Sequence, residues 1–172
     1  MANTTSASLK LTVQATGENS GTWGQITNTN LLILEQAIGG YDAFNVTNAS
    51  RALTFTNGAV SDGKNEVIKL TGTLEGNLNV TIPDSVEKTY IVEDGTDHAG
   101  YTLTFKTTSG TGVLLCEGHS YTLYSDGTNV VKAGELRKWR AISSAETIQA
   151  GAQILSNTNS GAVTITLPAS PS

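Results

Sequence analysis

Residues 17–41 carry the clearest helical spacing of apolar positions in this sequence. At about 100° per residue, seven apolar side chains fall within one arc roughly 160° wide. They are Trp23, Ile26, Leu31, Ile33, Leu34, Ala37 and Ile38. Thr22 is suited to cap the start, with Gln25 at the capping-box position, and Gly39-Gly40 can close the last turn in a left-handed conformation. The pattern predicts one amphipathic helix between Thr22 and Gly40.

Two residues of this helix depart from a simple two-faced pattern. Leu32 lies among the polar side chains, and Asn30 lies near the centre of the apolar arc. The arc is wider than the seam of a coiled coil, which predicts contacts with more than one neighbour. Around a three-fold axis, a buried Asn30 would set register and oligomeric state. The alternative is a helix packed on the sheet of its own domain, with Leu32 and Asn30 at the surface.

After residue 41 the period changes to two, which is typical of half-buried β-strands. The predicted strands are residues 44–46, 53–55, 67–71, 78–82, 89–93, 101–107, 112–116, 120–125 and 129–132. Turn signals such as Asn57-Gly58 and Asp126-Gly127 separate them. Strands about 8 to 12 residues apart with tight turns between them predict an antiparallel β-sandwich-like module over residues 42–134.

Residues 1–8 are small and polar, and residues 9–14 alternate between apolar and polar side chains. They predict a half-buried strand or an extended arm that becomes ordered when something else holds it. With the helix, they form an N-terminal region for attachment, residues 1–41.

The C-terminal part differs from the β-module. Residues 135–146 break the alternation and predict one or two helical turns or a strap, which Trp139 could anchor. Strand patterns return at 147–155 and 163–167, so residues 147–172 are interpreted as the beginning of a second β unit. Either its strands pair with other chains, or the sequence is the beginning of a longer protein.

The composition favours a β-rich structural protein. The chain has 172 residues, a net charge of −5, 15% charged residues and 18 glycines. It has no basic run beyond residues 137–140, so we expect no nucleic-acid partner. No segment resembles a signal peptide or membrane span, which predicts synthesis in a cytoplasm and no membrane anchor. The single cysteine, Cys116, excludes an intrachain disulfide and is interpreted as a buried small apolar residue.

Candidate chemistry is sparse. Residues 94–98 bring together Asp94, Asp97 and His98, which could form a metal site or an acid–base pair, but a polar hairpin loop is the favoured interpretation. His119 has no partner pattern nearby. The sequence has no phosphate loop and no hydrolase or metalloprotease motif. We therefore expect no enzyme, no cofactor and no metal, the alternative being a glycan-cleaving carboxylate pair formed in space.

Residues 11–41 resemble the N-terminal stretch of tail-fibre and related virion structural proteins of tailed bacteriophages, especially phages of marine bacteria. The most specific parts are Gly17-Glu18-Asn19-Ser20-Gly21-Thr22-Trp23-Gly24, Thr27-Asn28-Thr29-Asn30 and Glu35-Gln36-Ala37-Ile38. Downstream, Val80-Thr81-Ile82-Pro83 and residues 125–131 look like the β-module that follows in such proteins. The resemblance covers most of residues 9–133. It implies a homotrimer, an N-terminal part that docks on the tail, and contact with the host surface through a distal part outside this sequence.

The resemblance and the pattern together predict a virion structural protein, the N-terminal portion of a tail fibre that supports host adsorption. Residues 1–41 would dock on a tail adaptor, a nozzle or another tail protein. The predicted assembly interface is Trp23, Ile26, Asn30, Leu31, Leu32, Ile33, Leu34, Ala37 and Ile38. One alternative is a receptor- or carbohydrate-binding module that uses exposed tyrosines, for which Tyr41, Tyr101, Tyr121 and Tyr124 are the candidates. Another is a capsid decoration protein or a baseplate component.

Overall fold

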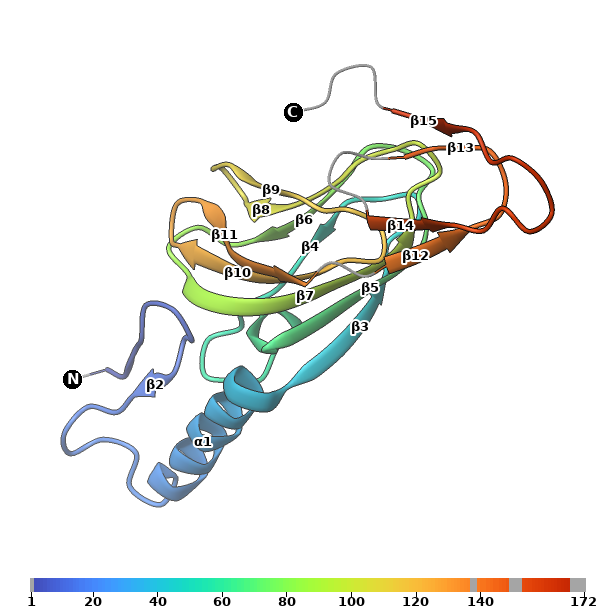
Figure 1. Ribbon diagram of the computed structural model, residues 1–172. Coiled ribbons are helices and arrows are strands. Elements are labelled where there is room, and N and C mark those ends of the chain that lie inside the picture. Colours follow the sequence, from blue (N-terminus) through green and yellow to red (C-terminus); the bar gives the residue numbers. More distant parts are fainter. Residues whose placement is uncertain (1, 137–138, 149–152, 168–172) are drawn as a thin grey trace. The chain divides into compact units, whose positions relative to one another are not determined.

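The structure is a computed structural model that describes residues 2–136, 139–148 and 153–167 (Figure 1). Within these residues the chain is mainly β, as predicted, with one α-helix. The expectations for residues 137–138, 149–152 and 168–172 lie outside the described residues. The chain divides into two compact units, Met1–Glu135 and Leu136–Ser172.

The first unit opens with two short antiparallel strands, β1 (Thr4–Thr5) and β2 (Thr12–Val13), followed by the helix α1 (Trp23–Gly39). The bounds of the helix are as predicted, but its ends are built differently. The Thr22 hydroxyl donates to the carbonyl of Asn19 and does not cap the helix. Gly40 is extended, with φ −69°, because the chain enters a strand at the next residue and leaves no room for a left-handed turn.

The chain then winds in successive turns, passing from one sheet to the other and back. We call this wound part of the first unit the coil. β3 (Tyr41–Asn45), β5 (Val67–Thr73) and β7 (Glu87–Asp97) lie side by side in one sheet. β4 (Arg51–Ala52), β6 (Leu78–Ile82) and β8 (Leu103–Thr107) lie side by side in the other. Successive strands alternate between the sheets, so neighbours within each sheet are parallel. One turn of the coil takes roughly 25 residues. A short 3-10 helix, η1 (Asp62–Lys64), lies between β4 and β5.

Three further strands close the coil. β9 (Gly112–Leu114) pairs antiparallel with β8, and β10 (Ser120–Asp126) pairs antiparallel with β7. β11 (Val130–Leu136) follows β10 after the predicted Asp126-Gly127 turn, which confirms this hairpin. The sheets therefore have the orders β11-β10-β7-β5-β3 and β4-β6-β8-β9.

The predicted direction of the strands is wrong for the coil. Most predicted strands exist near their expected positions, but β3, β5 and β7 run parallel, as do β4, β6 and β8. An alternating strand has the same period of two in either direction, so the pattern does not report direction. The order of strands in space depends on where each connection crosses, which the turn residues do not state.

The two sheets face each other across one apolar core. Its buried members come from both sheets and their connections: Phe44, Val46, Leu53, Ile68, Leu70, Leu74, Leu78, Val80, Ile82, Tyr90, Val92, Leu103, Phe105, Leu115, Tyr121, Leu123 and Val130. The rings of Tyr90 and Phe105 meet across the layers with centroids 5.4 Å apart. The core of the first unit therefore lies between two layers of strands.

Gly110 fills a place where no side chain fits. A Cβ atom there would lie 1.8 Å from the carbonyl oxygen of Thr128, between the β8–β9 and β10–β11 connections. We expect Gly110→Ala to destabilise the unit by roughly 1–3 kcal/mol, because backbone must move to admit the methyl group. Urea unfolding followed by circular dichroism measures the change. Gly76→Ala is the matched control, since nothing lies within 4 Å of its Cβ position. Equal effects of the two substitutions would contradict the argument.

The second unit also pairs its strands in parallel. β12 (Trp139–Ile142) pairs with β14 (Gln153–Ser156), and β13 (Glu146–Thr147) pairs with β15 (Ile165–Thr166). The helical turns predicted for 135–146 are wrong for the described residues, which hold the end of β11 and all of β12. The irregular spacing there reflects short strands that change sheets. Strands thus begin again at 139, within the segment that was expected to be a linker or strap.

Candidate functional site

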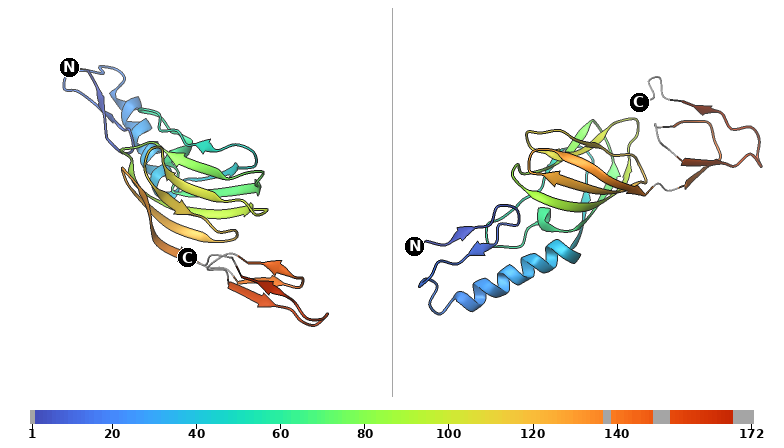
Figure 2. Two further views of the ribbon diagram at one scale, coloured as in Figure 1. Left: turned by 90° about the horizontal axis from the view of Figure 1, so that it is seen from above. Right: turned by 60° about the vertical axis from the view of Figure 1, so that its left-hand side comes forward.

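The helix α1 projects from one end of the coil, together with the N-terminal arm, which we define as residues 2–16 (Figures 1 and 2). Its wide apolar arc divides into two stripes. Ile33 is fully buried against its own chain, and Ile26 and Ala37 are half-buried. This first stripe faces the arm and the coil, so Ile33 has no surface left for a second copy.

Asn30 belongs to the first stripe and holds the arm. Its side-chain oxygen accepts the N–H of Thr12 at 2.9 Å, and its side-chain nitrogen donates to the carbonyl of Thr12 at 2.8 Å. The amide thus pairs with one residue of β2 as a neighbouring strand would. Gln14 adds a bond from Nε2 to the hydroxyl of Thr27, at 3.2 Å. The position of Asn30 on the apolar arc is explained within one chain, and a role in trimer register stays a prediction.

The arm is also tied to the coil. The N–H of Gly58 donates to the carbonyl of Lys10 at 2.7 Å. The hydroxyl of Ser8 accepts the N–H of Glu87 at 3.2 Å. Residues predicted to be ordered only by something else are therefore held here by their own helix and coil.

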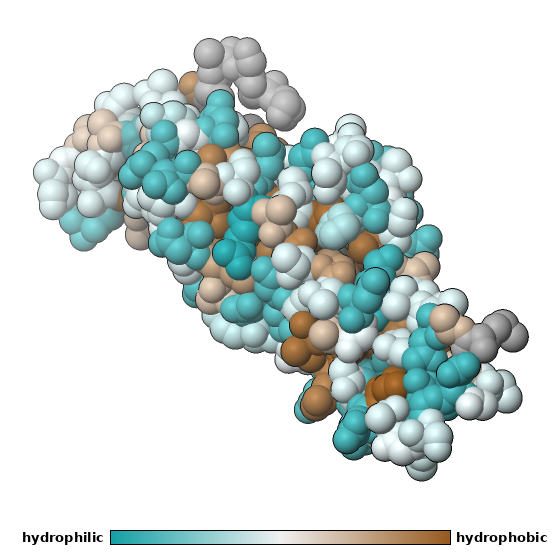
Figure 3. All heavy atoms as spheres, turned by 180° about the vertical axis from the view of Figure 1, so that it is seen from behind, coloured by the Kyte–Doolittle hydropathy of each residue, from teal (hydrophilic) through white to brown (hydrophobic). Residues whose placement is uncertain are grey.

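The second stripe of the helix is uncovered by the described chain. Trp23 is 64% exposed, Leu31 57%, Leu34 36% and Ile38 77%. Leu31, Leu34 and Ile38 follow the three-then-four spacing of a coiled-coil seam. We call Trp23, Leu31, Leu34 and Ile38 the open seam. Apolar residues are visible around the helix in the view from behind (Figure 3).

Leu32 lies apart from the open seam and is 54% exposed. At about 100° per residue it points roughly 160° away from Leu34, so one partner cannot bury both along a single seam. The nine predicted interface residues are thus divided by the structure into an inward stripe, the open seam, and Leu32 alone.

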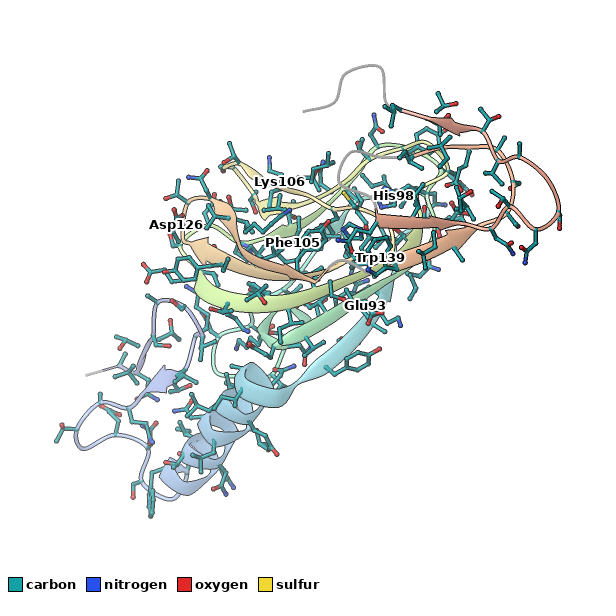
Figure 4. All side chains as sticks on the ribbon, viewed as in Figure 1. Glu93, His98, Phe105, Lys106, Asp126 and Trp139 are labelled. Carbon is teal, nitrogen blue, oxygen red and sulfur yellow. The ribbon has the colours of Figure 1, made fainter. Side chains whose placement is uncertain are left out.

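A second notable site lies inside the coil, on β7. Asp94 is fully buried, and its Oδ2 lies 2.7 Å from Nε2 of His98, which is 2% exposed. Its Oδ1 accepts the hydroxyl of Thr96 at 2.6 Å and the N–H of Thr96 at 3.1 Å. Figure 4 shows His98 at the opposite end of the coil from Asp126. The predicted hairpin loop at 94–98 is wrong, because the inward face of β7 continues through Asp94 and Thr96, and His98 is buried beyond them.

The connection between β9 and β10 supplies the surroundings of this polar cluster. The backbone of Asp94 bonds both Gly118 and His119, and the His119 side chain is buried. Glu117 accepts the backbone N–H of His98 at 3.4 Å. Cys116, expected to be buried, is only half-buried, and its N–H donates to the hydroxyl of the buried Tyr121. The cluster is a satisfied polar part of the core, closed to solvent at Asp94 and His98.

The His98 imidazole should make the stability of the coil depend on pH. Burial disfavours its charged form, but the hydrogen bond and charge of Asp94, with Glu117 and Asp97, raise the pKa of His98 above its ordinary value. The folded state therefore holds the proton more tightly than the unfolded state. The resulting stabilisation is complete below the ordinary pKa and is lost as pH rises through the raised pKa.

We expect the urea midpoint of the wild type to decrease as the pH rises above about 6.5, the ordinary pKa of histidine. In His98→Gln this decline should be absent, since no imidazole titrates at the site. An equal decline in both proteins would assign the effect to another group.

A shallow surface pocket lies at the first turn of the coil. It is lined by Asn45, Thr47, Asn48, Ala49, Ser50, Arg51, Ala52, Thr54 and Asp62, and has a volume of about 440 Å³. Arg51 donates to Asp62 at 3.0 Å and lies 4.2 Å from the ring centre of Phe44. None of these lining residues of the described chain is aromatic, whereas sugar-binding sites commonly include an aromatic side chain.

The candidate tyrosines are spread over the unit. Tyr41, Tyr101 and Tyr124 are exposed, whereas Tyr121 is buried. Tyr41 and Tyr124 lie on β3 and β10, which are separated by two strands. They do not form one aromatic platform.

Within the described residues, no group of three or more acidic, histidine or cysteine side chains is placed to hold a metal ion. The helix that the structure describes is too short and too polar to cross a membrane. Comparison with protein-family models, with curated proteins and with solved structures found no match. The likeness to tail fibres thus rests on the sequence motifs alone.

Proposed function

We propose that this chain is a non-enzymatic assembly protein of a phage virion, the N-terminal portion of a tail fibre that forms a homotrimer through α1. The observation that carries the proposal is the open seam. Four large apolar side chains stand on one stripe of a helix whose neighbouring stripe is already occupied by its own chain. Soluble proteins seldom leave such a stripe in water without a partner.

The open seam is suited to pack against the same helix of a second and a third chain. Leu31, Leu34 and Ile38 have coiled-coil spacing, and like helices can interlock these side chains around a shared axis. Full burial of one large apolar side chain contributes about 1.5–3 kcal/mol, so three chains would gain enough to outweigh the cost of association.

The arm and Leu32 are proposed to contact a tail adaptor, nozzle or other tail protein. Residues 2–39 stand at one end of the coil, where a tail protein could reach them without disturbing the core (Figure 2). Leu32 offers a separate apolar contact on the far side of the helix from the seam. The host surface would be met by a more distal part of the assembled fibre.

An assembly role is also supported by the placement of the acidic and histidine side chains. Asp94 and His98, the strongest candidates for acid–base chemistry, are closed to substrate by burial. The carbohydrate-binding alternative has less support, because the surface pocket lacks an aromatic wall and the exposed tyrosines are dispersed. A decoration or baseplate protein would use the same seam at another place on the particle.

The test is the mass of the full chain in solution, measured by light scattering after size exclusion. We expect about three times the chain mass of 17.9 kDa. Electron microscopy of particles labelled with an antibody to this chain then distinguishes tail, capsid and baseplate. A monomer with an intact helix at high concentration would overturn the proposed assembly.

A further inference from the structure

The loop that receives the arm contains the dipeptide Asn57-Gly58, and we propose that it is a site of spontaneous deamidation that the docked arm holds in check. In this reaction the backbone nitrogen of Gly58 attacks Cγ of Asn57. A nitrogen–carbon bond forms, the bond from Cγ to Nδ2 breaks, and ammonia leaves with the proton from the Gly58 amide. Water then opens the cyclic imide to aspartate or isoaspartate. Glycine after asparagine favours this attack, because it has no Cβ to obstruct the ring.

The side chain that would react is accessible. Asn57 is exposed, and its side chain makes no hydrogen bond within the described part of the chain. Water and hydroxide therefore reach Cγ freely. Nothing at Asn57 itself protects the site.

The protection lies at the attacking atom. The N–H of Gly58 donates to the carbonyl of Lys10 at 2.7 Å, and this proton must leave before the nitrogen can attack. A Cβ at Gly58 would lie 2.4 Å from the hydroxyl of Thr12, so the arm is seated directly against this residue. The arm thus controls both the availability and the movement of the nucleophile.

A buried lysine fixes the rest of the loop. The fully buried Lys64 ammonium donates to the carbonyls of Thr56 and Ala59, at 2.6 Å and 2.5 Å. The residues on either side of Asn57-Gly58 are therefore held while the arm is docked. When the arm leaves, the freed Gly58 amide remains in a loop whose two ends are positioned, and the reaction can begin.

The product would not receive the arm as before. Deamidation places a carboxylate where a neutral amide stood, and the isoaspartate product adds a backbone carbon between Cα and Gly58. The Gly58 N–H would then be displaced from the Lys10 carbonyl. A temporary release of the arm, by any cause, becomes permanent once this chemistry has occurred.

The first test compares the folded full chain with a synthetic peptide of residues 54–61 at mildly alkaline pH. Peptide mapping by mass spectrometry follows the exchange of the Asn57 amide for a carboxyl group. We expect conversion in the protein to be at least about tenfold slower than in the peptide, as expected for an amide protected by structure. Equal rates would overturn the proposal, whatever the behaviour of any variant.

The second test varies the hold on the arm. Asn30→Ala removes both bonds to Thr12, and Thr12→Pro removes the N–H that Asn30 accepts. Asn28→Ala is the matched control, an exposed asparagine on the same helix. Hydrogen exchange of the Gly58 amide reports arm release directly. We expect Asn57 conversion to rise wherever Gly58 exchange rises, by about two- to tenfold for each hydrogen bond lost, and to match wild type in the control.

The two measurements must change together across the proteins. Faster Gly58 exchange without faster conversion would overturn the proposal, and so would faster conversion with Gly58 still protected.

Discussion

Replacing Leu34 and Ile38 together with glutamate is expected to reduce the proposed trimer to monomers. In a three-fold seam these side chains face the common axis, so six carboxylates would be brought close together in a poorly solvated space. Like charges and desolvation both oppose this arrangement, and the lost apolar contacts add to the penalty. Analytical ultracentrifugation should show a single monomeric species at concentrations where the wild type is expected to form trimers.

Leu32→Glu is the control for this double variant. It makes the same chemical change on the same helix, at a position that is exposed and roughly 160° from Leu34. We expect Leu32→Glu to remain trimeric, while binding to a tail partner weakens if that partner uses this face. Circular dichroism of all three proteins shows whether α1 is retained. Monomers from Leu32→Glu, or trimers from the double variant, would contradict the assignment of the seam.

Replacing Asp94 with alanine is expected to destabilise the first unit by about 3–5 kcal/mol. Asp94 is fully buried and accepts from Thr96 and His98, so its removal leaves buried donors without an acceptor. It also removes the charge that favours protonated His98. Urea unfolding monitored by far-UV circular dichroism gives the change in the free energy of unfolding.

Two further substitutions separate the causes of this loss. Asp97→Ala removes an exposed carboxylate from the same strand and should have little effect. Asp94→Asn keeps the shape and an acceptor for Thr96 but not the charge, so its cost should be intermediate and its stability less dependent on pH near neutrality. If Asp94→Ala were as mild as Asp97→Ala, the polar cluster would contribute little to the fold.

The strands could be predicted from the sequence because alternation is a local property. Residues 78–82 were expected as a strand and form β6 with the same bounds. The parallel coil could not be predicted in the same way. The recurrence of roughly 25 residues that places Val67 beside Tyr41 and Ile91 is carried by no shared motif, only by similar apolar spacing.

The sequence does contain a pattern that indicates the polar cluster, but the turn-forming residues Asp94-Gly95 obscure it. The inward positions of β7 run Lys88, Tyr90, Val92, Asp94 and Thr96, so the alternation of β7 continues through residues that usually mark a turn. The dipeptide Asp94-Gly95 favours a turn when considered alone. Here the chain stays extended, because the inward face of β7 is buried between the two sheets. Continuing the period of two through polar residues would have placed Asp94 and His98 inside.

The helix was predicted more fully than its contacts. Its bounds and its wide apolar arc follow from residues 22–40 alone. Which part of the arc faces the arm depends on Asn30, whose amide bonds the backbone of Thr12. Because the partner is backbone, no side chain in the sequence identifies this contact. The division between an inward stripe and the open seam therefore required the structure.

The winding of the chain between two sheets also sets an order for its completion during synthesis. Each turn of the coil needs only the turn before it, so β5 can add to β3, and β7 to β5, as they emerge from the ribosome. The free edge of β7 stays open until β10 arrives to pair with it. Until residue 126 has emerged, nascent chains on neighbouring ribosomes present an unpaired strand edge to one another, and the β10–β11 hairpin ends that exposure.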